Sequence, residues 1–172
     1  MAERLTIGLS LSTSGEYAAM GRQAEAALRL FVAEASAAGP IRIGGVRYEL
    51  ALDCHDDQSN PARAAEIYRS LCSDRRADLI FGPYSSRLTS AVAPIVEQAG
   101  MVMVNHGGAS DELYTRNYRL IVGVLTPASD YLVSFARLLA SLKLWRKRVA
   151  IVISPTPFAR AVAAGFERAC QE

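Results

Sequence analysis

The stretch Leu79-Ile80-Phe81-Gly82-Pro83-Tyr84-Ser85-Ser86 decides the fold, because a short apolar run leads there directly into a loop of small and hydroxyl-bearing residues. The same order recurs at Ser12-Thr13-Ser14-Gly15 and at Asn105-His106-Gly107-Gly108-Ala109-Ser110, each of which also follows an apolar run. In an open α/β sheet, ligands bind in the crevice outside the carboxyl ends of the strands. The repetition therefore predicts three loops that together hold a small molecule.

Strand and helix patterns alternate around this stretch. Residues 5–11 and 46–54 alternate apolar with polar side chains, as strands do, and residues 77–81 and 101–104 are short apolar runs. Each is followed by a segment with apolar residues at helical spacing, and the second of these helices is expected to begin at Asn60-Pro61. Four strand-then-helix units predict an α/β fold with a Rossmann-like parallel sheet and helices on both faces.

The pattern restarts after residues 120–124. Residues 149–153 predict a further strand, and segments with apolar residues at helical spacing lie on both sides of it. One βα unit cannot bury both faces of a second sheet. We therefore divide the chain into a first ligand-binding lobe, residues 1–122, and a crossover with the first βα unit of an incomplete second lobe, residues 123–172. We expect the chain to be a fragment of a longer protein.

Composition and charge exclude several classes of partner. The 172 residues carry 19 basic and 17 acidic side chains, and a formal charge of only +2 at pH 7 predicts no nucleic-acid partner. No apolar run approaches the roughly 18 residues that span a bilayer, so we expect no direct membrane insertion. The amino terminus lacks the apolar segment of a secretory signal, which was either removed or never present. Three cysteines without metal-type spacing argue against a zinc site or a disulfide framework, and no cofactor is expected.

Several short motifs occur in a specific order along nearly the whole chain. They are Leu5-Thr6-Ile7-Gly8 with Ser14-Gly15, Met20-Gly21, Asp56-Asp57-Gln58-Ser59-Asn60-Pro61, Phe81-Gly82-Pro83-Tyr84-Ser85-Ser86, and Glu97-Gln98-Ala99-Gly100. In this order they resemble the type I periplasmic binding proteins, specifically the branched-chain amino acid and amide-binding receptors of ABC transporters. The resemblance implies two Rossmann-like lobes that close on a solute, with residues 120–124 as the first crossover. It also implies a noncatalytic periplasmic or extracytoplasmic receptor whose partner is a membrane permease.

The same resemblance implies a set of ligand-binding residues. Ser86 matches a serine whose hydroxyl meets the ligand carboxylate or amide, and Gly107, Gly108 and Ala109 match a loop that presents main-chain groups. The remaining matches are Met20 and Tyr84 for the walls of the side-chain pocket and Phe158 for the aromatic face that closes over the ligand. Family members that bind α-amino acids commonly carry threonine where this chain has Ala109, which argues against a standard amino acid as the ligand. The expected ligand is a small polar solute, namely an amino acid, an amide or a small carboxylic acid.

The chemistry of these residues, taken without the resemblance, also favours a ligand site. Ser85 and Ser86 begin a predicted helix, where hydroxyls and unpaired N–H groups favour an anionic or carbonyl group. The alternative is plain helix capping, which serines perform whether or not a ligand binds. For Gly107 and Gly108 the alternative is a turn with positive φ or close backbone packing. Ordinary packing is likewise the alternative for the Met20, Tyr84 and Phe158 side chains.

Other functions find weaker support in the sequence. An enzyme would need a nucleophile and base, but only His55 and His106 are available and no G-x-S-x-G motif occurs. His55-Asp56-Asp57 could suggest a metal, but we expect these polar side chains to be solvated. A flavodoxin-like electron carrier would use residues 12–15 as a phosphate loop, against which Glu16 argues by charge repulsion. A ligand-sensing domain of a signalling or regulatory protein, including a cytoplasmic sensor, stays open as an alternative within the same fold.

Overall fold

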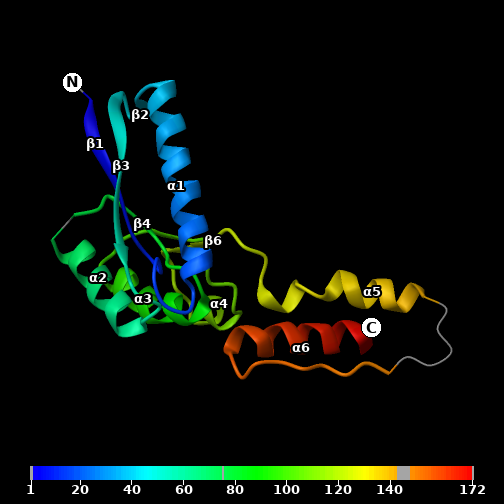
Figure 1. Ribbon diagram of the computed structural model, residues 1–172. Coiled ribbons are helices and arrows are strands. Elements are labelled where there is room, and N and C mark those ends of the chain that lie inside the picture. Colours follow the sequence, from blue (N-terminus) through cyan, green and yellow to red (C-terminus); the bar gives the residue numbers. More distant parts are fainter. Residues whose placement is uncertain (1, 75, 143–147, 172) are drawn as a thin grey trace.

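The four strands predicted at residues 5–11, 46–54, 77–81 and 101–104 lie in one six-stranded sheet, together with two short strands (Figure 1). The computed structural model describes residues 2–74, 76–142 and 148–171. The order in the sheet is β2-β3-β1-β4-β5-β6. The strands span Glu3–Leu11 (β1), Ile41–Ile43 (β2), Val46–Asp56 (β3), Leu79–Phe81 (β4), Met103–Asn105 (β5) and Ile121–Gly123 (β6). The α/β fold class is thereby confirmed.

All neighbouring strands except one pair run parallel. β1 lies between β3 and β4, and β5 and β6 follow outward, each paired in parallel with its neighbour. β2 pairs antiparallel with β3, so that Ile43 lies opposite Val46. The two residues between them, Gly44 and Gly45, have φ of 56° and 86°, which is the backbone of a two-residue hairpin turn. This hairpin was not predicted, because three residues are too few to show strand periodicity.

Four helices connect the strands and cover the sheet. They are α1 (Ala18–Ala38), α2 (Pro61–Ser73), α3 (Ser86–Gln98) and α4 (Glu112–Thr115). The Asn60 side chain caps α2 as predicted, since its oxygen accepts the N–H of Ala62 at 2.9 Å and that of Arg63 at 3.3 Å. α2 and α3 pack together on the sheet over a core that includes Tyr68, Leu71, Ile80, Leu88, Val92, Val96 and Met103.

α1 lies along β1 and β3 and approaches the tip of β1 very closely (Figure 1). The contact is made by Gly21, the one buried residue of this 21-residue helix. A Cβ on Gly21 would lie 2.6 Å from the carbonyl carbon of Ser12 and closer still to its oxygen. Only glycine therefore lets the helix sit against the loop that follows β1.

The chain beyond the sheet differs from the sequence prediction at one point. After β6 come a 3₁₀ turn (η1, Ala128–Asp130), α5 (Val133–Ser141) and α6 (Pro157–Gln171), and α5 and α6 lie side by side away from the sheet (Figure 1). The predicted strand at residues 149–153 is wrong for this structure, since no strand is assigned there. A strand needs a neighbour to pair with, and the described residues supply none; Val152 is accordingly 96% exposed. Within the described ranges, no helix is long and apolar enough to cross a membrane.

Candidate functional site

The carboxyl ends of the parallel strands lie on one edge of the sheet. β1 ends at Leu11, β3 at Asp56, β4 at Phe81 and β5 at Asn105, and the pairing registers place these ends next to one another. The loops that follow the strands therefore gather at this edge. This is the arrangement that the sequence pattern predicted, and the point where the chain changes direction across the sheet lies between β1 and β4.

A buried carboxylate ties the β1 and β3 tips together. Asp57 is fully buried and accepts the hydroxyls of Ser10 at 2.6 Å and Ser12 at 2.5 Å, together with the backbone N–H of Ser59 at 3.0 Å. The expectation that Asp57 is solvated is therefore wrong. A carboxylate buried at this depth needs several hydrogen bonds to offset its lost hydration. Ser10 at the end of β1, Ser12 just after it and the backbone of Ser59 supply them, so these polar groups stabilise the fold.

Asp56 occupies the loop that a phosphate would need. Its Oδ1 accepts the N–H groups of Thr13 at 2.9 Å, Ser14 at 3.3 Å and Gln58 at 2.9 Å, and its Oδ2 accepts the Ser14 hydroxyl at 2.7 Å. Partial burial by itself raises the pKa of Asp56, but these hydrogen bonds outweigh it and hold the pKa below its usual value. The donors that a phosphate loop of a flavodoxin-like carrier would use at residues 13 and 14 are thus already paired with an internal anion.

His55 pairs with Asp53 and not with Asp56 or Asp57, the two acidic residues that follow it. Its Nε2 lies 2.8 Å from Asp53 Oδ1, and Arg76 lies 3.0 Å from the other oxygen of the same carboxylate. Among the described residues, no group of three or more histidine, cysteine or acidic side chains is placed to hold a metal ion.

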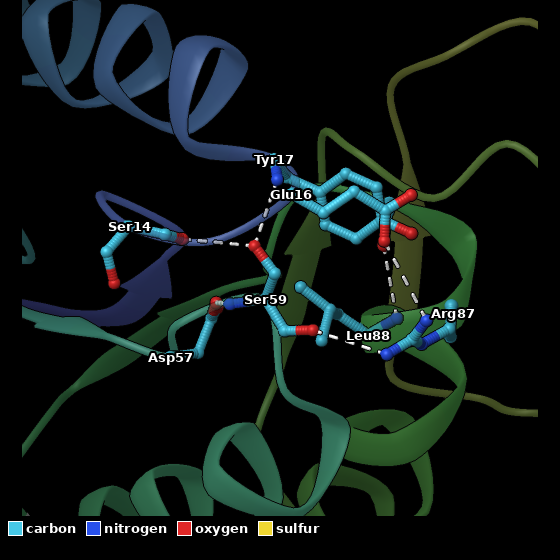
Figure 2. A network of polar contacts seen from close by, with 8 residues as sticks. Ser14, Glu16, Tyr17, Asp57, Ser59, Arg87 and Leu88 are labelled. Carbon is cyan, nitrogen blue, oxygen red and sulfur yellow. Dashed lines mark hydrogen bonds and ion pairs between the residues drawn. The ribbon is translucent and has the colours of Figure 1, made fainter.

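A chain of contacts crosses from the β1 loop to α3 (Figure 2). The Ser59 hydroxyl accepts the N–H of Tyr17 at 2.9 Å and donates to the carbonyl of Ser14 at 3.1 Å. The Arg87 guanidinium lies 3.4 Å from the Ser59 carbonyl and 4.0 Å from the Glu16 carboxylate. Figure 2 shows Glu16, in the loop after β1, and Arg87, in the first turn of α3, reaching toward each other. The pair is exposed and therefore stabilises the fold only weakly. It places one positive and one negative side chain at the rim, by which we mean the sheet edge formed by the loops after β1, β3, β4 and β5.

The serines at the start of α3 are held by the loop after β5. Ser85 has φ of 89°, and its hydroxyl accepts the N–H of Leu88 at 3.3 Å, while its own N–H donates to the Gly107 carbonyl at 3.1 Å. The Ser86 hydroxyl accepts the N–H of Ser110 at 3.0 Å, and Ser86 is 8% exposed. The capping alternative is thus confirmed for Ser85. Because Ser86 accepts a hydrogen bond here, its own proton stays free to donate.

Gly107 and Gly108 are required by close packing. A Cβ on Gly107 would lie 2.5 Å from the Pro83 carbonyl oxygen and 2.6 Å from the Cα of Tyr84. A Cβ on Gly108 would lie 2.7 Å from both the Leu113 side chain and the Thr89 hydroxyl. Neither glycine has a positive φ. Of the two alternatives to ligand contact, close backbone packing is the one the structure bears out.

Asn105 organises the same loop and was not singled out from the sequence. This fully buried amide donates from Nδ2 to the Gly108 carbonyl at 2.6 Å and to the Tyr114 hydroxyl at 2.8 Å. Its Oδ1 accepts the N–H groups of Gly107 at 3.3 Å and Gly108 at 2.8 Å. The sequence signal was available, since an asparagine two residues before a glycine pair often bonds the backbone N–H groups of the turn that follows it.

The predicted aromatic and methionine residues take separate places. The ring of Tyr84 meets Tyr17 edge to face, with centroids 5.9 Å apart, on the β1 side of the rim. Phe158, on α6, meets Tyr131 in the same way at 5.5 Å. Met20 lies near the start of α1 and is 43% exposed. The structure therefore groups Tyr84 with the Ser85, Ser86 and 107–109 cluster, and gives Phe158 a neighbour in the carboxyl-terminal part.

η1 is bonded directly to the loop after β5. The N–H of Ala128 donates to the Ala109 carbonyl at 2.8 Å, and the N–H of Ser129 donates to the Asp111 carboxylate at 3.1 Å. α6 in turn packs on η1 through Gly165, where a Cβ would lie 2.5 Å from the carbonyl carbon of Ser129. The carboxyl-terminal part thus touches the rim at the residues predicted to meet a ligand.

The sequence of residues 4–172 matches the family described as periplasmic binding protein. The chain belongs to the periplasmic binding protein family. This confirms the resemblance inferred from the motifs. Members of the family bind solutes and are not enzymes.

Solved periplasmic binding proteins share the fold of this chain. A solute-binding protein of an ABC transporter from Rhodopseudomonas palustris BisB5, in complex with 3,4-dihydroxybenzoic acid, has a TM-score of 0.82 at 20% identity and covers 98% of this chain and 44% of its own. An ABC transporter substrate-binding protein from Desulfitobacterium hafniense, in complex with leucine, has a TM-score of 0.79 at 21% identity, covering 98% and 48%. A putative branched-chain amino acid ABC transporter protein from Rhodospirillum rubrum has 0.75 at 23% identity, covering 99% and 47%. The chain spans less than half the length of these relatives.

Proposed function

We propose that this chain provides the first ligand-binding lobe, residues 1–122, and the opening of a second lobe, residues 123–172, of an extracytoplasmic receptor for an ABC-type uptake system. The ligand is a small polar solute that carries a carboxylate or a carbonyl group. The observation that carries the proposal is the meeting of α3's amino terminus with the loop after β5, through Ser86 and Ser110. An uptake role is favoured over a sensor because the three solved proteins described above are each named as components of ABC transporters.

The polar anchors in this proposal are Ser86 and the backbone at 107–109. α3 is 13 residues long, and its amino terminus adds unpaired N–H groups and a positive dipole end to the Ser86 hydroxyl. Such a terminus favours an acidic or carbonyl group of a ligand. Ser85 and Tyr84 complete the wall on this lobe, with Met20 beyond them, and Phe158 closes from the second lobe.

The groove between α5 and α6 supports the division into two lobes. A hollow of about 510 Å³ lies there, lined in part by Ala136, Leu139, Val149, Ile151 and Phe166. Apolar surface of this kind is normally covered in a folded domain. A second lobe with further strands would cover it, consistent with relatives that are about twice as long.

The proposal is tested by ligand-induced stabilisation of the full-length protein. The probes are leucine and 3,4-dihydroxybenzoate, which the solved relatives hold, together with neutral amides of similar size. A ligand that binds only the native state raises the melting temperature in proportion to the logarithm of its concentration. If neither acidic probe nor any small carboxylic acid shifts the melting temperature, the proposed ligand class is wrong.

Replacing Ser86 with alanine then examines the site itself. We expect binding to weaken by about 0.5–3 kcal/mol, the range for a neutral to charge-assisted hydrogen bond. The free protein should also become less stable, because the N–H of Ser110 loses its acceptor. Isothermal titration measures the first effect and thermal melting the second. Unchanged affinity would remove Ser86 from the ligand site.

A further inference from the structure

Ser110 carries a hydroxyl for which the fold provides no partner. Only 1% of the residue is exposed, and its Oγ makes no hydrogen bond within the described part of the chain. Leaving a buried hydroxyl unpaired costs stability, so native structures keep such groups where something else bonds to them. A contrast lies nearby in Thr89, an equally buried residue whose hydroxyl reaches the Ser85 carbonyl at 2.9 Å and the Pro83 carbonyl at 3.3 Å.

The hydroxyl lies close to that of Ser86. The Ser86 Oγ is 3.0 Å from the backbone nitrogen of Ser110, and covalent geometry keeps a serine Oγ within about 4 Å of its own nitrogen. The two hydroxyls are therefore at most roughly 7 Å apart. One carboxylate can bridge that separation, because each of its oxygens accepts a hydroxyl at about 2.5–3.0 Å.

The neighbourhood suits an acceptor group. Ser86 already accepts a hydrogen bond, so its proton is available to donate, and the amino terminus of α3 adds positive potential at the same point. Ala109, the adjacent residue, offers no hydroxyl of its own. A hydroxyl at Ser110 supplies a second donor to the same group.

A neighbouring element is bonded to the loop that carries two of these residues. Ser86, Ala109 and Ser110 are all buried, and η1 is held against their loop by the bonds from Ala128 and Ser129. η1 begins the carboxyl-terminal part of the chain. On the proposed function, in which two lobes close on a solute, a ligand would reach the loop while the lobes are apart and would be enclosed when they close.

We propose that Ser110 is a specificity-determining residue, which donates its hydroxyl to the ligand carboxylate beside Ser86. This inference rests on the proposed function. It predicts that the protein prefers an acid to the matching neutral amide, because both hydroxyls donate to a full negative charge.

The test compares Ser110→Ala with the unaltered full-length protein, using isothermal titration with leucine, 3,4-dihydroxybenzoate and 3,4-dihydroxybenzamide. The affinity of the variant for an acidic probe that binds should fall about tenfold or more, and its preference for acid over amide should shrink. The melting temperature of the free variant should be unchanged or higher, since an unpaired buried hydroxyl is removed. Ser110→Cys, which keeps the shape but donates weakly, should lose affinity in the same direction and serves if the alanine variant does not fold.

Thr89→Val is the matched control. It removes a buried hydroxyl that has partners, so it should lower the melting temperature while the affinity stays within about twofold. If the unaltered protein binds an acidic probe and Ser110→Ala binds it equally well, the role of Ser110 is refuted and the proposed function stands. If the unaltered protein binds neither acidic probe nor any small carboxylic acid, the proposed ligand class fails, and this inference fails with it.

Discussion

Gly21→Ala gives a sharp test of how α1 is seated on the tip of β1. A Cβ at this position would lie 2.6 Å from the Ser12 carbonyl carbon and 3.0 Å from its nitrogen, with the oxygen nearer still. Ordinary contact would require a displacement of roughly 1 Å, and the obstacle is backbone that cannot rotate away. The Ser12 hydroxyl is also bonded to buried Asp57, which resists that displacement.

The expected loss combines two opposing effects. Overpacking of this kind costs about 1–3 kcal/mol, and a fixed backbone obstacle places it at the upper end. Alanine is the better helix former by about 1 kcal/mol, which offsets part of that loss. The net expectation is a destabilisation of about 2 kcal/mol, or roughly 4–8 °C in melting temperature for a chain of this size.

Urea unfolding followed by circular dichroism measures the change. Ala27→Gly, at an exposed position of the same helix, is the control that reports helix propensity alone, and it should destabilise by about 1 kcal/mol. The sign of the change in unfolding free energy is decisive, because replacing an unconstrained helical glycine with alanine would stabilise the protein. A Gly21→Ala protein as stable as the unaltered chain, or more stable, would refute the close approach of α1 to Ser12.

Two further predictions concern titratable groups. The pKa of Asp56 lies below its usual value near 3.8. The ionised carboxylate therefore stabilises the fold above that pH, and this stabilisation is lost as the pH falls through the lower pKa of the folded state. Asp56→Asn should be less stable than the unaltered protein at pH 7, and its stability in urea unfolding should depend less on pH between pH 2 and 5. Burial raises the pKa of the Cys54 thiol to about 11, and Cys170 is exposed, so a maleimide at pH 7.5 should modify Cys170 first and Cys54 only after unfolding. Mass spectrometry of the labelled protein checks the order, and equal labelling rates would contradict it.

The parallel sheet and its shared loop edge could be predicted from the sequence because their signals are local. Alternation in residues 5–11 and 46–54 and the helical spacing after them each depend on a single element, and four repeats of the pattern fix the class of fold. The hairpin strand β2 escaped prediction, since three residues carry no period. Residues 149–153 have the composition of a strand, but strand formation depends on a pairing partner that composition cannot reveal.

The candidate site was less predictable because its roles depend on tertiary contacts. Asp57 lies in a polar stretch that is typical of a solvated turn. It is buried because the hydroxyls of Ser10 and Ser12, more than forty positions earlier in the sequence, donate hydrogen bonds to its carboxylate. Gly107 could serve either a ligand or a neighbouring backbone, and only the position of Pro83 and Tyr84 decides for the backbone. Ser110 shows no sequence signal of its own, because the property that distinguishes it is a buried hydroxyl without a hydrogen-bond partner among the described residues, which only the structure reveals.

The uncovered run at residues 149–153 has a consequence for handling the polypeptide. Val149, Ile151, Val152 and Ile153 are branched aliphatic residues with no charge among them, and all four are exposed. Short uncharged runs of this kind recruit identical copies of themselves into cross-β stacks. Whatever shields this run in the cell also keeps the polypeptide from aggregating, and a preparation in which it stays bare will be limited by its solubility before its binding can be measured.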